Sequence, residues 1–134
     1  MRQNKFSKKE LQAKEWIKRA TEDELSAEVI LKEEGGSPNT VCFLSQQMAE
    51  KHLKAFLVYN KKWYPRIHPL DKLWELCKEF DKSFEEIKED SVFLTAFYTA
   101  TRYPGDYPEF SWEEAKKAFE SATKIKNFIL SKIN

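Results

Sequence analysis

The sequence predicts an all-α protein, an antiparallel up-and-down four-helix bundle with one additional short helix, formed by a single domain over residues 1–134. Apolar residues recur at steps of three and four along most of the chain, which is the period of a buried helix face. Capping-box sequences and breaks rich in proline or glycine divide this pattern into segments. No segment alternates with period two between hairpin turns, so no strand is expected.

The first two predicted helices are long and amphipathic. The first runs from about Lys8 to Glu34, begins with a capping box of Ser7 and Glu10, and ends where Gly35 and Gly36 precede a proline. Its apolar stripe comprises Ala13, Trp16, Ile17, Ala20, Ala27 and Leu31. The second runs from about Asn39 to Lys61, with an apolar half of Leu44, Met48, Ala49, Leu53, Phe56 and Leu57. Four polar residues project to its other side: Gln47, Glu50, Lys51 and Lys54.

Three further helices are predicted in the second half of the chain. After a loop over residues 62–67, His68 is expected to cap a short third helix with Pro69 at its first position. The inner face of this helix comprises Leu70, Leu73, Trp74, Cys77 and Phe80. A capping box of Ser83 and Glu86 opens a fourth helix that ends near residue 100. A loop over residues 101–110 follows, and a box of Ser111 and Glu114 opens a last helix to about residue 133.

Composition excludes several classes of protein. Lys and Arg number 23 against 22 Asp and Glu, so the net charge of +1 disfavours a strongly basic nucleic-acid binder. No apolar run approaches the length of a membrane span, and the first residues lead into charged sequence, so a cytoplasmic protein is expected. The widely spaced Cys42 and Cys77 form no CxxC pair and are expected to be ordinary buried thiols. Three glycines cannot form a P-loop or GxGxxG turn, and two histidines without HExxH predict no metal site and no cofactor.

Several segments of the sequence match one family in the same order. Cys42-Phe43 followed by Gln46-Gln47-Met48-Ala49-Glu50-Lys51-His52-Leu53-Lys54-Ala55 resembles the signature helix of small HEPN-domain proteins. His68-Pro69-Leu70 with Leu73 resembles their H-x-L-x-x-L segment, and Arg102-Tyr103-Pro104 with Asp106 resembles their RYP loop. The opening helix matches at Trp16, Ala20, Asp23 and Ala27, and the last helix at Glu114, Ala115 and Ala122.

The resemblance implies a dimeric bundle of four long helices and a short one. Similar prokaryotic proteins are commonly encoded beside a minimal nucleotidyltransferase and can bind it, some pairs acting as toxin and antitoxin. The family name proposes nucleotide binding, and several branches are metal-independent ribonucleases with an Arg followed, after four to six residues, by a His. This sequence departs from that motif, because Tyr107 lies where a histidine would follow Arg102. A phenol with a pKa of about 10 is a poor general base at neutral pH.

Two sets of residues are candidate recognition sites. In the first, the Arg102 guanidinium suits a phosphate or carboxylate, and Tyr103, Tyr107 and Phe110 offer flat faces to a base or a partner side chain. Alternatively, Arg102 pairs with Asp106 or Glu109 and only fixes the loop. The second set comprises Gln47, Glu50, Lys51 and Lys54, which could cross a dimer interface or face the Arg102 loop. Alternatively, these residues are exposed, and Glu50 and Lys54 form an ordinary surface pair.

Histidines and one aromatic loop complete the candidates. His68 could act as a general base or phosphate ligand beside an arginine, or it could only cap a helix. His52 lies on the apolar half of its helix and is expected to be a core residue with its polar atoms satisfied. Trp63, Tyr64 and Arg66 could stack bases and neutralise phosphates, or pack over the end of the bundle. The many Lys and Glu residues suit a heat-tolerant surface of ion pairs.

The sequence therefore favours a non-catalytic, nucleotide-associated module that forms a homodimer and binds a minimal nucleotidyltransferase, as in a toxin–antitoxin pair. Its nucleotide- or partner-binding residues would be Arg102, Tyr103, Asp106, Tyr107, Gln47, Glu50, Lys51 and Lys54. The alternative is a metal-independent ribonuclease in which Arg102 acts with His68 or Tyr107. Stand-alone nucleotide binding is a third hypothesis.

Overall fold

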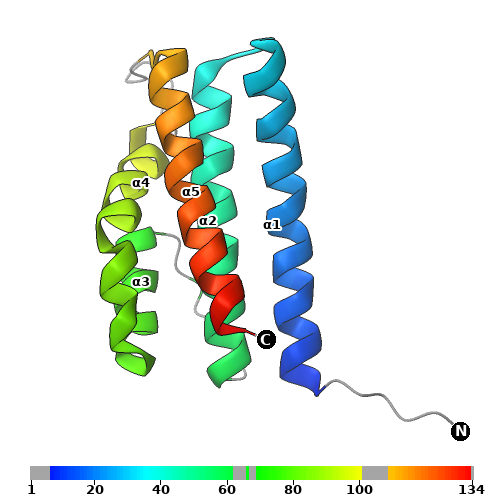
Figure 1. The fold of residues 1–134 in the computed structure, drawn as a ribbon, viewed down its shortest axis with the longest axis vertical. Helices are drawn as coiled ribbons and strands as arrows, with labels where there is room; N and C mark the ends of the chain where they lie inside the picture. Colours follow the sequence, from blue (N-terminus) through cyan, green and yellow to red (C-terminus); the bar gives the residue numbers. More distant parts are fainter. Residues whose placement is uncertain (1–6, 62–65, 67–68, 101–108, 134) are drawn as a thin grey trace, which may run out of the picture.

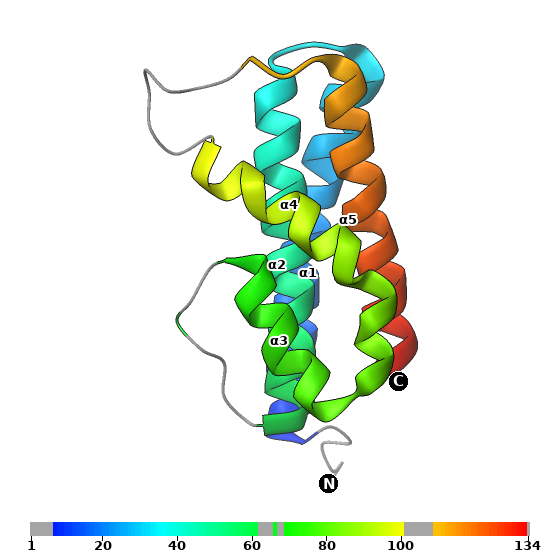
Figure 2. The same ribbon diagram turned by 90° about the vertical axis from the view of Figure 1, so that its left-hand side faces the viewer.

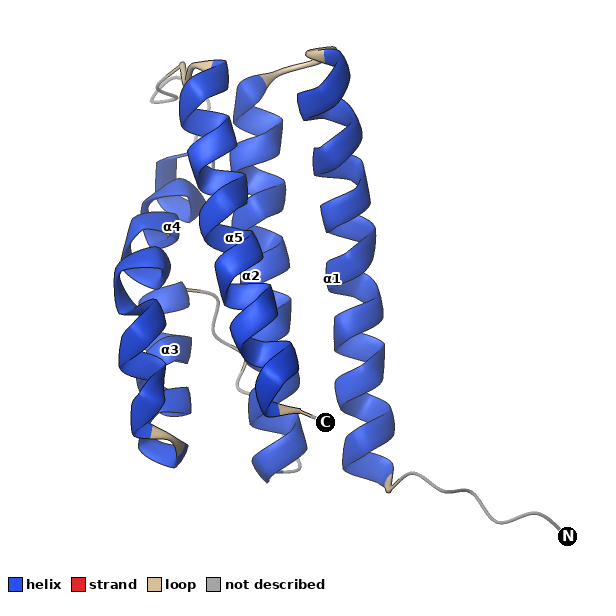
Figure 3. Cartoon of the chain, in the orientation of Figure 1, coloured by secondary structure: helices blue, strands red, loops and turns tan. Residues whose placement is uncertain are grey.

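The computed structural model describes residues 7–61, 66, 69–100 and 109–133, and within these ranges the protein is helical with no strand (Figures 1 and 3). The all-α prediction is therefore confirmed. The elements are α1 (Lys8–Glu33), α2 (Pro38–Lys61), α3 (Leu70–Phe80), a 3-10 segment η1 (Lys82–Ile87), α4 (Lys88–Ala100) and α5 (Trp112–Lys132). In the part of the chain that the structure describes, no helix has the length and apolar character needed to cross a bilayer.

Helix α2 is the central element of the bundle. It packs against α1, α3, α4 and α5, and almost every residue from Val41 to Val58 is at least half buried. Figure 2 shows α3 and the obliquely running α4 on one side of α2, whereas Figure 1 places α1 at the opposite edge of the bundle. Polar residues in the middle of α2 therefore lie beside side chains of a neighbouring helix.

Alanines form the inner seam of α1. Ala13, Ala20 and Ala27 lie seven residues apart and are fully buried, and their small side chains let the backbone of α1 approach that of α2 closely. The capping box of Ser7 and Glu10 is present at the start of this helix, as predicted. Glu34 closes the helix in the left-handed conformation, so the predicted end of α1 is also confirmed.

The start of the fourth helix differs from the sequence prediction. The Asp81 carboxylate, not a capping box of Ser83 and Glu86, caps this segment, because it accepts hydrogen bonds from the backbone amide and the hydroxyl of Ser83. The buried indole of Trp74 donates to the Phe84 carbonyl at 2.6 Å, which occupies an acceptor that a continuous α-helix would use. The chain consequently forms 3-10 turns over η1, and α4 begins only at Lys88.

Two smaller predictions have mixed outcomes. Pro69 is the N-cap of α3, so the helix begins one residue later than predicted, and His68 lies outside the described residues. The capping box of Ser111 and Glu114 opens α5 as predicted. Cys42 and Cys77 are free buried thiols, which confirms the sequence prediction.

Candidate functional site

The predicted site residues divide into two groups in the structure. Those of the two loops lie outside the described residues: Trp63, Tyr64, His68, Arg102, Tyr103, Asp106 and Tyr107. Arg66 is described and is exposed. The four polar residues of α2 are all described, and we call Gln47, Glu50, Lys51 and Lys54 the polar face of α2. This face is therefore the part of the candidate site whose geometry can be derived.

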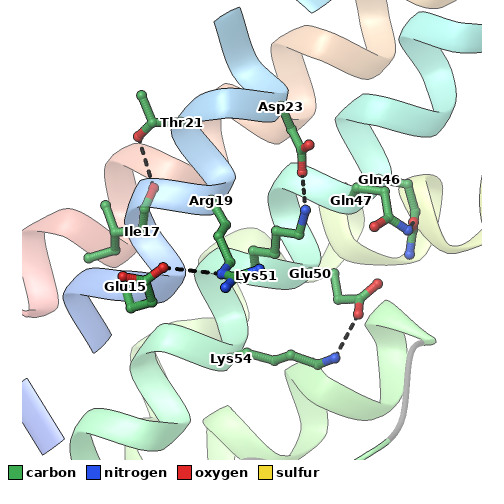
Figure 4. Close-up of polar contacts among 10 residues, drawn as sticks. All are labelled: Glu15, Ile17, Arg19, Thr21, Asp23, Gln46, Gln47, Glu50, Lys51 and Lys54. Atoms are coloured by element: carbon green, nitrogen blue, oxygen red, sulfur yellow. Dashed lines mark hydrogen bonds and ion pairs between the residues drawn. The ribbon is translucent and has the colours of Figure 1, made fainter. Parts of the chain in front are cut away.

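A buried ion pair lies at the centre of the polar face. The Lys54 ammonium is 2.7 Å from a carboxylate oxygen of Glu50, one helical turn away (Figure 4). Glu50 is 4% exposed and Lys54 is 3% exposed, so the interpretation of these residues as an ordinary surface pair is wrong. The reason is the position of α1, whose Trp16 ring lies over the Lys54 ammonium at 5.3 Å from the ring centroid.

Lys51 connects the polar face to α1. Its ammonium is 2.6 Å from a carboxylate oxygen of Asp23, and both side chains are largely buried (Figure 4). Gln47 is half buried and donates through its amide to the neighbouring Gln46 side chain at 3.4 Å. Phe43, one turn before Gln47, is 40% exposed. Toward the start of α2, the buried ion pair of Glu50 and Lys54 is thus followed by the exposed ring of Phe43.

The exposed end of the face adjoins a hollow at the start of α2. The hollow has a volume of about 760 Å³ and is lined by Gly36, Ser37, Pro38, Asn39, Thr40, Phe43, Glu109 and Phe110. The Asn39 side chain accepts a hydrogen bond from the Phe110 amide at 2.9 Å, which ties the start of α2 to the segment before α5. Two aromatic rings and an amide are thereby presented beside the polar face.

Asp23 and Trp16 are members of this site that the sequence analysis named only as helix positions. They lie seven residues apart on α1, so a helical projection places them on one side of the alanine seam. This seven-residue spacing is the feature of the sequence that indicates their shared position on α1. It could not show which lysine each residue contacts, because the partners are 28 and 38 residues away in the sequence.

A second buried set lies on the other side of the alanine seam of α1. Glu24, adjacent to Asp23, accepts from the Lys126 ammonium of α5 at 2.8 Å. His52 of α2 is 1% exposed, and burial, with a smaller contribution from the positive charge of Lys126, lowers its pKa from 6.5 to about 4. The predicted core position of His52 is confirmed. The expectation that its polar atoms are satisfied is wrong, because neither ring nitrogen has a hydrogen-bond partner among the residues that the structure describes.

Two features describe the titratable and metal-ligating groups among the described residues. His52 is the one histidine that the structure describes, and it is neutral at pH 7 and enclosed in the core. Within the described ranges, no group of three or more His, Cys, Asp or Glu side chains could hold a metal ion. On the polar face the Glu50–Lys54 pair is buried, whereas the neighbouring Phe43 ring is exposed.

Comparison with known proteins agrees with this architecture. Residues 13–133 match the family model for the HEPN domain. A crystal structure of an archaeal HEPN homologue is similar, with a TM-score of 0.73 and 28% sequence identity over 91% of this chain and 98% of that one. No curated protein matches significantly. Because the family model covers nearly the whole helical bundle, the chain belongs to the HEPN-domain family.

Proposed function

We propose that this HEPN domain is a nucleotide-associated binding module that forms a homodimer and binds a minimal nucleotidyltransferase, as in a toxin–antitoxin pair. The exposed end of the polar face of α2, at Gln47 and the adjacent Phe43, is one recognition surface. Arg102, Tyr103, Asp106 and Tyr107 form the second. The protein has no catalytic role in this proposal, and the partner supplies any chemistry. It acts in the cytoplasm.

The buried pair of Glu50 and Lys54 is the observation that carries the proposal. Burial of two charges has a large desolvation cost, and well-packed apolar residues commonly hold helices together equally well or better. The bundle therefore does not need an ion pair at this position for stability. The pair, with Lys51 held by Asp23, fixes the orientation of charged groups beside Phe43 and Gln47, which are accessible to a partner.

Exposed Phe43 gives this surface an anchor. Aromatic side chains surrounded by ordered polar groups are frequent centres of binding energy in protein interfaces. Phe43 lines the 760 Å³ hollow, so a partner side chain or a planar base could insert beside it. Binding would then require little movement of α2, because its neighbouring charges are already paired.

The ribonuclease alternative receives no support from the described residues. Its residues Arg102, His68 and Tyr107 lie outside them, and His52 is too deeply buried to reach RNA. Incubation of the pure protein with RNA in EDTA tests this alternative directly. Cleavage that is lost in both Arg102→Ala and His68→Ala would establish it and would overturn the non-catalytic proposal.

Co-expression with the minimal nucleotidyltransferase encoded nearest to this gene tests the partnership. The two proteins are expected to co-purify and to remain together at micromolar concentration. Phe43→Ala should weaken the complex by about tenfold or more, whereas Phe93→Ala, a ring of nearly equal exposure on α4, should not. Two proteins that elute separately would refute the partnership. Calorimetry with ATP on the complex and on each protein tests the nucleotide association.

A further inference from the structure

The outward face of α1 carries a stripe that the bundle does not use. Six residues follow one another at alternating steps of four and three, on the side of the helix opposite the alanine seam: Leu11, Glu15, Lys18, Glu22, Leu25 and Val29. All six are exposed, and the apolar members Leu11, Leu25 and Val29 are 43%, 56% and 62% exposed. Among the described elements, α1 packs only against α2 and α5. Alternating steps of four and three are the spacing of a helix–helix seam.

The basic and acidic residues of α1 are arranged in the order that the helix dipole disfavours. Residues 8–20 contain five basic and two acidic residues, a net charge of +3. Residues 21–33 contain one basic and five acidic residues, a net charge of −4. A helix dipole favours the opposite arrangement, with acidic residues near the N-terminus and basic residues near the C-terminus. Among the described residues, only Asp23 and Glu24 of these acidic residues form ion pairs with other helices, so the remaining asymmetry needs another explanation.

The stripe is complementary to itself when the second helix runs antiparallel. Rotation about a two-fold axis at the level of Ala20 places Leu11 opposite Val29 and Lys18 opposite Glu22, and the symmetry makes each contact twice. Glu15 lies opposite Leu25 but is already paired with Arg19 of its own helix at 3.3 Å. A parallel arrangement would instead place Lys18 against Lys18 and Glu22 against Glu22.

We propose that the outward face of α1 is a self-association surface through which two copies of this chain pair antiparallel, with the two-fold axis at the level of Ala20 along the helix. Apolar contacts at both ends of the seam supply the binding energy, and the exposed charges between them fix the direction and register. The inference rests on the homodimer of the proposed function and names its surface. It leaves the exposed Phe43 ring of α2 accessible to another partner.

Disulfide trapping of the pure chain tests the direction of pairing. In the antiparallel arrangement Leu11→Cys/Val29→Cys should oxidise to a covalent dimer, because each new thiol faces its counterpart in the other copy. Leu11→Cys alone should remain unlinked, because the two thiols would lie about 27 Å apart, eighteen residues at 1.5 Å each. The native Cys42 and Cys77 are buried and do not contribute.

Charge reversal tests the register on the same protein. Lys18→Glu should raise the dimer dissociation constant, measured by sedimentation, about tenfold, because it places two carboxylates opposite each other twice. Lys18→Glu/Glu22→Lys should restore dimerisation. Lys117→Glu, an exposed lysine of α5, is the matched control and should have no effect.

The outcomes separate this inference from the proposed function. A chain that is monomeric at 0.1 mM overturns the inference and the homodimer, but the nucleotidyltransferase partnership is judged by co-purification alone. A dimer that is unaffected by Lys18→Glu retains the homodimer and overturns the α1 surface. A dimer in which Leu11→Cys alone crosslinks retains the homodimer and overturns the antiparallel pairing.

Discussion

Acidification of the solution to pH 5 tests the environment of His52. The folded protein holds this imidazole in the core with a pKa of about 4, whereas the unfolded chain restores it to about 6.5. Between these two values the unfolded chain binds a proton that the folded protein does not. The free energy of unfolding therefore falls as the pH falls below about 6.5, and this loss saturates below about 4.

The pKa difference sets the size of this effect. A displacement of the His52 pKa from 6.5 to about 4 corresponds to roughly 3 kcal/mol of stability when titration is complete. At pH 5 about 2 kcal/mol should already be lost relative to pH 7. Hydrogen bonds from Ser83 and Lys132 lower the Asp81 pKa from 3.8 to about 2, so the stability that this carboxylate contributes is lost only at lower pH. The pH 5–7 window is therefore suited to His52.

Urea unfolding followed by circular dichroism, in steps from pH 7 to pH 5, measures this loss. His52→Leu should remove about 2 kcal/mol of the pH dependence, because the comparison between variant and wild type cancels every other titrating group. It should also be neutral or stabilising at pH 7, since it removes two unsatisfied nitrogens from the core. Met48→Leu, a core substitution on the same helix, should retain the wild-type pH dependence. Equal pH dependence in wild type and His52→Leu would refute the argument.

Three other predictions follow from the packing. Burial raises the pKa of the Cys42 thiol to about 12, and Cys77 is buried as well. Neither thiol should therefore react with a disulfide reagent such as DTNB until the protein is unfolded in urea. Lys54→Met should lower the free energy of unfolding by about 3–5 kcal/mol, because it leaves the Glu50 carboxylate buried beside an apolar side chain. Arg19→Ala, which breaks an exposed ion pair, should lower it by less than about 1 kcal/mol. Ala20→Leu should lower stability by about 1–3 kcal/mol in the same assay, since Ala20 is fully buried where α1 packs against α2 and a larger side chain would overpack this seam.

Local patterns in the sequence were sufficient for most of the fold. The capping boxes at Ser7 and Ser111 involve residues three apart, and the seven-residue spacing of the alanines is visible without knowledge of their partner helix. The start of α4 could not be predicted in this way. It depends on the Trp74 indole reaching the Phe84 carbonyl, a contact between side chain and backbone that no helical period encodes.

The candidate site was predicted less completely for a similar reason. Four residues of the polar face were identified from their projection on one helix, but their burial depends on Trp16 and Asp23 of another helix. Helical periodicity assigns a side chain to a face and cannot state what covers that face. For His52, periodicity predicted the burial but not the unsatisfied nitrogens, which depend on the neighbouring side chains.

The two ion pairs of α1 explain how an alanine seam holds a unique register. Alanines at a seven-residue period would pack against α2 almost equally well if α1 moved by one heptad, so the seam alone does not fix the position of α1 along its neighbour. Asp23 and Glu24 remove this ambiguity, because a heptad in either direction would bring apolar residues to Lys51 and Lys126 and leave both ammonium groups unpaired. Since the two carboxylates lie on either side of the seam, they also fix the rotation of α1 about its axis. We infer that these buried pairs set which side chains α1 turns outward, and hence the geometry of any surface it offers to a partner.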